Sequence, residues 1–349
     1  MDRDADFYAR MTDSSRRRRR WPIVIAGLAV VVAGLLIGAW NVTLPFYAFS
    51  PGPVGDALDA VKASEVEVFE AEEELLMLTV SSQEVNPIEA FLAGIDPTVD
   101  LVRREAVRRP DETDEEFVSR NQASMDQSKE VAITLALRRL GYQVNTSSDG
   151  VEIVDVDETA PAAKVLQPSD VITAVEGVLV ELPAEIGEAL TERQPGDLIA
   201  LDLTRDGEEI SVEVELIARD DDPAKPLIGI SVGALAPRFE FPFPIDIDAG
   251  LIGGPSAGMM YALAVMEILT PGSLSSGHIV AGTGTIDVEG NVGGIGGVRQ
   301  KVVAAEAAGA EVMLVPASNY EEALTAPRNG IELIPVGTLD EALEALANL

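Results

Sequence analysis

A serine in a glycine-rich loop and a lysine further along the chain have the types and spacing of a nucleophile and its base. Ser256 lies in the segment Gly-Gly-Pro-Ser-Ala-Gly at 253–258, directly before an almost wholly apolar segment at 259–269. A segment that is apolar on every side predicts a buried helix, so Ser256 lies where a loop enters a helix. Backbone N–H groups at a helix start can hold an oxyanion, and we expect those of Ser256 and Ala257 to do so. A serine that only caps a helix would show a similar pattern.

The candidate base is Lys301, which follows the glycine-rich stretch 293–297 and lies in a predicted helix. The helical period places it on an apolar face with Val298 and Ala305. The chain has 5 lysines and 20 arginines, and only a lysine can lose its proton near neutral pH. Because burial disfavours the charged ammonium, we expect a lowered pKa and a neutral amine that can accept the proton of Ser256.

The composition excludes several classes of site. The 349 residues include 25 basic and 59 acidic ones, a net charge of −34, which leaves no basic surface for nucleic acid. With no cysteine and one histidine, the chain has no disulfide, thiolate site or zinc site with two imidazoles, and we expect no metal and no cofactor. His278 is the only base for a Ser–His–Asp triad, but no nucleophile motif lies near it, which favours a surface or strand-edge position. No G-x-x-x-x-G-K-S/T motif occurs, so we expect no ATP hydrolysis.

The N-terminal segment predicts a membrane anchor. Residues 21–40 carry no charge and would span about 30 Å as a helix, the thickness of a bilayer core. Five arginines at 16–20 precede them and predict a cytoplasmic N-terminus. The alternatives fit less well, because a buried core helix needs a polar stripe or a shorter run and a cleaved signal peptide has a shorter apolar region. We therefore expect a single-pass protein of the cell membrane with extracytoplasmic C-terminal domains.

Residues 41–143 predict an α/β scaffold without chemistry of its own. Short strands are expected at 66–69 and 75–80, and Thr113 with Glu116 forms a capping-box pattern for a long helix. From residue 149 onward the pattern changes to short strands and turns, with strands expected at 150–154, 171–175, 198–204 and 210–216.

This second region resembles a bacterial PDZ domain. The resemblance rests on residues 150–177 and 194–209, with Pro168-Ser169-Asp170 where the family usually has Pro-Gly-Asp. It implies that a peptide adds as a strand beside the first strand of the domain, with its carboxylate end held by the preceding loop. Carried over by position, the peptide-binding residues are Asp149, Gly150, Val151, Glu152 and Ile153. A β-rich spacer without a ligand is the alternative.

The last third resembles the proteolytic domain of the Lon proteases. The likeness covers about 225–349 and is carried by residues 253–258, 281–311 and 314–323. By position it implies that Ser256 is the nucleophile and Lys301 its general base, with the hydroxyl of Thr283 helping to hold the lysine. One departure stands at Gly253, where the typical Lon motif has an acidic residue.

Together these features predict a membrane-anchored serine endopeptidase of the PDZ–Lon type that works without ATP at the outer face of the membrane. The predicted fold class is α+β, with a single transmembrane helix, a PDZ domain and a Lon-type domain. The domain limits are 1–20 for a basic tail, 21–40 for the anchor, 41–143 for the α/β region, 144–220 for the PDZ domain and 225–349 for the Lon-type domain. Whether the PDZ domain precedes the Lon-type domain or is inserted in it is left open, because the strands before residue 80 could belong to the Lon-type sheet.

The expected partners are protein or peptide substrates and a membrane, contacted through one helix, with no nucleic acid. Assembly into a homo-oligomer and assistance by a separate ATPase are left open. The rival interpretation is a catalytically idle, membrane-tethered scaffold that binds peptides through its PDZ domain. The intact set of Ser256, Lys301 and Thr283 argues against it.

Overall fold

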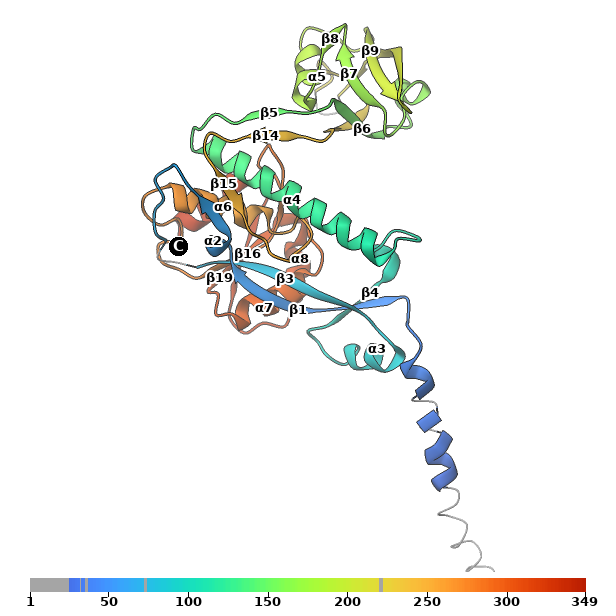
Figure 1. The fold of residues 1–349 in the computed structure, drawn as a ribbon, viewed down its shortest axis with the longest axis vertical. Helices are drawn as coiled ribbons and strands as arrows, with labels where there is room; N and C mark the ends of the chain where they lie inside the picture. The colour runs from blue at the N-terminus through green and yellow to red at the C-terminus, as the bar shows by residue number, and fades with distance from the viewer. Residues whose placement is uncertain (1–24, 32, 35–36, 72–73, 220–221) are drawn as a thin grey trace, which may run out of the picture. The chain divides into compact units, whose positions relative to one another are not determined.

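The computed structural model describes residues 25–31, 33–34, 37–71, 74–219 and 222–349 (Figure 1). The chain divides into two compact units. Unit 1 combines the residues up to Leu140 with Phe243–Leu349, and unit 2 is Gly141–Pro242. Unit 2 is therefore inserted between two parts of unit 1, which answers the question of order that the sequence left open.

The predicted membrane anchor is wrong. Residues 25–31, 33–34 and 37–40 are helical, but no helix in the part of the chain that the structure describes is long and apolar enough to cross a membrane. A spanning helix needs about 20 consecutive apolar residues. The same finding overturns three expectations that depended on the anchor. These are the single-pass membrane location, the cytoplasmic N-terminus and the contact with a membrane. The expected basic tail at 1–20 lies outside the described residues.

Unit 1 is built on a six-stranded sheet to which both parts of the chain contribute. Its strands lie in the order β20-β19-β16-β3-β1-β4. They are β1 (Phe46–Asp56), β3 (Leu75–Glu84), β4 (Asp100–Arg103), β16 (Val280–Gly282), β19 (Val312–Pro316) and β20 (Glu332–Val336). β3, β16, β19 and β20 run parallel, whereas β1 is antiparallel to β3 and to β4. The architecture is mixed α/β, which corrects the α+β class with a membrane helix.

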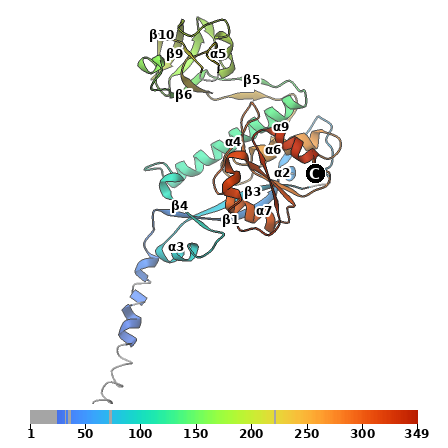
Figure 2. The ribbon, with the colours of Figure 1, turned by 180° about the vertical axis from the view of Figure 1, so that it is seen from behind.

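Helices cover both faces of this sheet. They are α2 (Ala57–Ala60), α3 (Pro87–Ala93), α4 (Asp114–Arg139), α6 (Gly258–Leu269), α7 (Val298–Ala307), α8 (Tyr320–Ala323) and α9 (Leu339–Ala347), with 3-10 turns at Arg104–Ala106 and Ala317–Asn319. Successive strand residues point to opposite faces. Ala281 packs in the core around α7, whereas Gly282 lies against Met260 of α6. α4 lies alongside α6 on the same side of the sheet (Figure 1; Figure 2).

Local sequence signals explain several of these elements. Thr113 and Glu116 form the expected capping box at the start of α4, because each side chain accepts a hydrogen bond from the backbone N–H of the other. The expected strand at 75–80 is part of β3, but residues 66–69 form no strand. Two short pairs complete unit 1: β2 (Val61–Ala63) with β15 (Ile245–Ile247), and β17 (Thr285–Ile286) with β18 (Val292–Gly293).

Unit 2 contains a second sheet, in the order β10-β9-β7-β6-β13, with β8 paired to β7. Its elements are β5 (Asn145–Ser147), β6 (Val151–Val156), a 3-10 turn (Pro161–Lys164), β7 (Val171–Val175), β8 (Val178–Leu179), α5 (Pro183–Ala189), β9 (Leu198–Arg205), β10 (Glu208–Glu215), β11 (Ile217–Ala218), β12 (Pro226–Leu227), β13 (Ile230–Ala234) and β14 (Arg238–Glu240). All four strands expected in this region are present. Alternate residues such as Ile153, Ile172 and Leu201 form its core. β5 pairs with β14, so the chain enters and leaves unit 2 at neighbouring positions.

Candidate active site

The loop 253–257, called the serine loop below, places Ser256 two residues before the start of α6. Every residue of α6 is buried, which fixes the helix and therefore the end of the loop. The carbonyl oxygen of Ser256 accepts hydrogen bonds from the N–H of Gly284 (2.8 Å) and from the hydroxyl of Thr283 (3.0 Å). Both donors directly follow β16, so the central sheet positions the backbone of Ser256.

Helix α4 holds the same loop from the other part of the chain. The N–H of Gly254 donates to the carbonyl oxygen of Asn121 (2.8 Å), and the hydroxyl of Ser128 donates to the carbonyl oxygen of Pro255 (3.1 Å). A Cβ on Gly258 would lie 2.6 Å from the Ser128 hydroxyl, so this approach requires glycine at the start of α6. Asn121 and Ser128 of α4 therefore hold the serine loop at two neighbouring residues, through the N–H of Gly254 and the carbonyl of Pro255.

The same contact explains Gly253, where the Lon pattern has an acidic residue. A Cβ at this position would lie 3.0 Å from the Cβ of Asn121 and 3.5 Å from its carbonyl carbon. Such an approach is tighter than ordinary van der Waals contact, so a side chain at 253 would require Asn121 or the serine loop to shift by a few tenths of an ångström.

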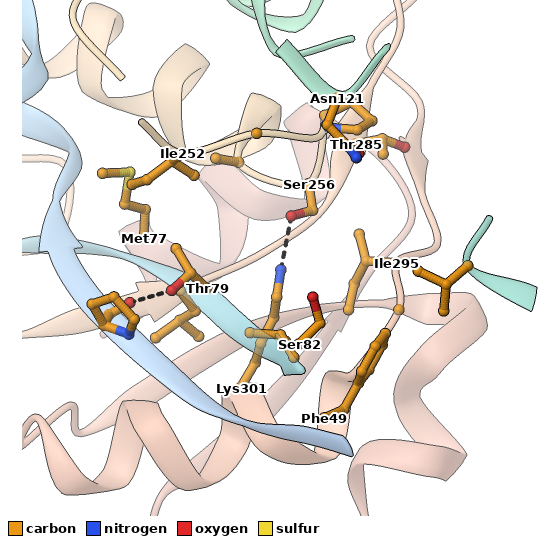
Figure 3. Close-up of a pocket in the computed structure, with 18 of the residues that line it drawn as sticks. Phe49, Met77, Thr79, Ser82, Asn121, Ile252, Ser256, Thr285, Ile295 and Lys301 are labelled. Atoms are coloured by element: carbon orange, nitrogen blue, oxygen red, sulfur yellow. Dashed lines mark hydrogen bonds between the residues drawn. The ribbon is translucent and has the colours of Figure 1, made fainter. Parts of the chain in front are cut away.

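Lys301 reaches the serine loop from α7 on the opposite face of the sheet. Its side chain is 2% exposed. The Nζ atom donates hydrogen bonds to the Oγ of Ser256 (2.8 Å) and to the Oγ1 of Thr283 (2.8 Å), and Figure 3 shows the first of these across the pocket. The structure thus brings together the three side chains that the sequence singled out.

The surroundings of Lys301 favour its neutral form. Burial lowers the pKa of Lys301 from 10.5 to about 7, and no carboxylate pairs with it among the described residues. The Thr283 hydroxyl gives its proton to the Ser256 carbonyl, so it can only accept from Lys301. When the amine is neutral, one N–H can bond Thr283 and the lone pair is free to accept the proton of Ser256.

Two backbone N–H groups beside the serine are available to a ligand. Within the described part of the chain, neither the N–H of Ser256 nor that of Ala257 donates to a protein acceptor. Both precede the first helical residue of α6, where the helix dipole favours negative charge. These are the groups expected from the sequence to hold an oxyanion.

A cavity of about 550 Å³ opens onto Ser256 and Lys301 (Figure 3). Its walls are mainly apolar, and they come from β1, β3, the serine loop and the loop before α7. The start of α4 contributes Phe117. Other apolar lining residues include Phe49, Met77, Leu78, Val80, Leu251, Ile252 and Ile295. Those from β1 and β3 were not predicted as site residues, because nothing local in their sequence indicates which strand lies beside β16.

The chain was compared with known families and proteins. Residues 139–216 match the PDZ domain family, and residues 245–348 match the C-terminal proteolytic domain of Lon protease (S16). The chain carries a PDZ domain and a Lon-type serine peptidase domain. The Lon protease of Koribacter versatilis (strain Ellin345) is 41% identical over 106 residues, which cover 29% of this chain and 13% of that protein. The Lon protease of Campylobacter concisus (strain 13826) is 27% identical over 169 residues, covering 47% of this chain and 20% of that protein.

Among solved structures, the PDZ domain of the SdrC-like protein from Listeria monocytogenes matches with 26% identity and a TM-score of 0.23. The match covers 24% of this chain and 87% of that structure. The chain spans a fifth or less of the length of the curated Lon proteases named above. The enzyme class expected from the sequence, a serine peptidase of the Lon type, is supported by these domain matches.

The peptide-binding edge predicted at 149–153 is not available in the PDZ unit. β6 has neighbours on both sides, with Glu152 opposite Val171 of β7 and opposite Gly233 of β13. A strand that is hydrogen-bonded on both sides cannot accept a third. Among the described residues this sheet has two edge strands, β10 and β13, and the edge next to β6 belongs to β13, whose sequence follows the region where we expected strands.

His278 takes the surface position that the sequence favoured. Its Nδ1 lies 2.8 Å from Oε2 of Glu311, and both side chains are solvent-accessible. The titratable side chain in contact with Ser256 is therefore that of Lys301 and not this histidine.

Proposed function

We propose that this chain is a serine endopeptidase that uses a Ser256–Lys301 dyad and needs no ATP. The observation that carries the proposal is the contact of 2.8 Å between Ser256 Oγ and a buried lysine whose pKa is lowered to about 7. A lysine of this pKa supplies a base at neutral pH without a histidine or a metal.

The reaction proceeds in two steps of acyl transfer. Ser256 Oγ attacks the carbonyl carbon of a peptide bond, and Lys301 takes the hydroxyl proton. The tetrahedral oxyanion is held by the N–H groups of Ser256 and Ala257. As the C–N bond breaks, Lys301 returns the proton to the leaving amine. Water then attacks the ester with Lys301 again as base, which releases the carboxylic acid and restores the Ser256 hydroxyl.

Thr283 has a positioning role in this proposal. Its hydroxyl bridges the Lys301 amine and the Ser256 carbonyl, so it fixes the amine toward the nucleophile. The sequence contains no phosphate-binding loop for ATP, and we propose that the substrates are segments of protein chain that are already unfolded or loose.

For the PDZ unit we propose peptide binding at the free edge of β13. The Ile153 N–H bonds the Asp170 carbonyl on the β7 side, so Ile153 and its partner Val232 form a pair without mutual hydrogen bonds. The N–H of Val232 therefore points to the free edge. Replacing Val232 by proline removes this donor at a position where an edge strand tolerates proline. We expect Val232→Pro to lose binding of C-terminal peptides in a fluorescence polarisation screen of the full chain.

The dyad is tested by cleavage of casein without ATP. We expect the wild type to cleave casein, Ser256→Ala and Lys301→Arg to lose cleavage with unchanged circular dichroism, and His278→Ala to keep it. Labelling by a fluorophosphonate probe distinguishes the peptidase from the rival interpretation, an idle scaffold. The probe should label the peptidase at Ser256, whereas an idle scaffold has no activated serine and should stay unlabelled. Equal cleavage by the wild type, Ser256→Ala and Lys301→Arg would contradict the dyad.

A further inference from the structure

A concentration of arginine lies at the end of β4 and in the segment that joins β4 to α4 (Figure 1). Arg103, Arg104, Arg108 and Arg109 are four of the chain's 20 arginines. The described part of the chain has no second stretch of this length with more than two arginines. Because the whole chain has 59 acidic and 25 basic residues, this segment is a local positive region on an acidic protein. Such a region attracts anions.

The four arginines line one pocket of about 630 Å³, called the arginine pocket below. Pro45, Phe46 and Pro110 form the apolar part of its wall, and Glu105 and Asp111 are its two carboxylates. A concave site of this volume, with apolar walls and a few charged groups, has the size and composition of a small-molecule site. With four guanidinium groups against two carboxylates, the pocket has an excess of positive charge.

Three of the four guanidinium groups have no strong partner in the chain. Arg103 lies 3.7 Å from Glu105 and Arg104 lies 3.7 Å from Glu84, and these side chains are exposed to solvent. At this distance the pairs are not hydrogen-bonded, and exposed ion pairs contribute little to stability. The side chain of Arg109 makes no hydrogen bond or ion pair with any residue that the structure describes. These three groups can therefore contact a ligand without breaking a strong internal bond.

The fourth guanidinium group, that of Arg108, is fixed in the wall. Arg108 is 8% exposed, and its guanidinium lies over the ring of Phe117, 4.6 Å from the ring centre. It also pairs with Asp114 at 2.6 Å. Its Nε atom has no hydrogen-bond partner among the described residues, so the contacts within the chain leave this group incompletely satisfied. A charge that is already held in place loses little conformational entropy when a ligand binds.

We propose that the arginine pocket binds a small soluble molecule through two or more linked phosphate groups. The planar guanidinium group matches phosphate oxygens in a bidentate geometry. Linked phosphates bring several negative charges into one compact group, whereas a single carboxylate brings one charge to four guanidinium groups. The concave shape of the pocket favours a small molecule over a flat surface. This site goes beyond the proposed peptidase function and does not depend on it.

The arginine pocket is separate from the catalytic cavity, although the two lie close together. No residue lines both. Val107, which lies between the arginines in the chain, lines the catalytic cavity, and so does Phe117, on which Arg108 stacks. A test of the arginine pocket must therefore distinguish it from Lys301, the cation of the neighbouring cavity.

Isothermal titration calorimetry of the full chain with sodium pyrophosphate at neutral pH, without divalent metal, tests the proposal. We expect a single site whose affinity falls about tenfold or more in Arg104→Gln and in Arg109→Gln, as for the loss of one charge-assisted hydrogen bond. Both arginines are exposed, so neither change disturbs the core, and circular dichroism checks the fold. Arg139→Gln is the matched control. It removes the same charge at the other end of α4, where Arg139 pairs with Asp340, and should bind as the wild type does.

Four results would overturn the proposal. The first is no binding of pyrophosphate, or equal affinity in the wild type, Arg104→Gln and Arg109→Gln. The second is equally tight binding of citrate, because the pocket would then recognise negative charge and not phosphate. The third is loss of pyrophosphate binding in Lys301→Met, which would place the anion in the catalytic cavity. The fourth is sedimentation with phosphatidylglycerol vesicles without binding of pyrophosphate, which would make the phosphate group that of a lipid.

Discussion

At the residue scale, the proposed dyad makes the reactivity of Ser256 depend on the pH at which the Lys301 amine loses its proton. Burial lowers the pKa of Lys301 to about 7, and the neutral amine is the form that accepts a proton. We expect the rate of Ser256 acylation by p-nitrophenyl acetate to rise with pH through about 7 and then to level off. Stopped-flow measurement of the p-nitrophenolate burst checks this, with Ser256→Ala as the blank. A midpoint near the ordinary lysine value of 10.5 would contradict a buried base.

The same lowered pKa means that Lys301 destabilises the folded chain below neutral pH, because its ammonium form is then buried. Between pH about 7 and 10.5 the unfolded chain holds a proton that the folded chain has released, so the free energy of unfolding rises with pH in this window. The full shift corresponds to roughly 5 kcal/mol. We expect Lys301→Met to be more stable than the wild type at pH about 6 and the difference to shrink as the pH approaches 10. Urea unfolding at a series of pH values measures it, and a difference that does not change with pH would contradict the shift.

The two side chains of the proposed dyad could be singled out from the sequence because their signals are local. Ser256 lies in a glycine-rich loop before an apolar helix, and Lys301 lies on an apolar helical face. Neither Met77 nor Asn121 has such a signal, because each reaches the site through a neighbour that is distant in sequence. The error at residues 149–153 has the same origin, since strand periodicity predicts a strand but not the strands beside it.

At the element scale, α4 acts as a support for the serine loop. Ser128 is 4% exposed, and its hydroxyl donates a hydrogen bond to the carbonyl of Pro255, the residue before Ser256. We expect Ser128→Ala to lower kcat about tenfold with a loss of stability near 1 kcal/mol, the usual contribution of one hydrogen bond. Ser119→Ala changes an exposed serine on the same helix and is the matched control. Peptide kinetics with thermal unfolding measure both effects, and equal kcat in the two variants would contradict the supporting role.

The sequence predicted elements well where one short signal determines them. The capping box at Thr113 and Glu116 identified the start of α4, because both partners lie within one turn. The apolar run at 21–40 predicted a spanning helix, but among the described residues no helix is long and apolar enough to cross a membrane. Residues 66–69 have a strand pattern, but the N–H of Phe69 bonds the carbonyl of Ile268 at the end of α6. A contact distant in sequence overrides the local pattern there.

At the scale of the whole molecule, the peptidase unit is assembled from two separate parts of the chain. Residues 245–348 match the Lon proteolytic domain, yet the sheet also needs β1, β3 and β4, and the serine loop needs α4. A fragment of residues 243–349 would leave one edge of β16 unpaired and the apolar surface of α6 without α4. The sequence was compatible with the insertion of unit 2 into unit 1 but could not establish it. The insertion follows from the pairing of β3 with β16, whose residues lie some 200 positions apart in the chain.

This arrangement predicts that unit 2 can be excised without loss of the dyad. Asn145 of β5 pairs with Glu240 of β14 in antiparallel register, so a two-residue Asn-Gly turn can join them in place of residues 146–239. We expect the shortened chain to fold, to hydrolyse p-nitrophenyl acetate at the wild-type rate and to lose binding of C-terminal peptides. The fragment 243–349, made as the comparison, should show no cooperative unfolding because β3 no longer completes its sheet. Ester hydrolysis that disappears on excision, in a chain that still unfolds cooperatively, would mean that unit 2 contributes directly to the dyad.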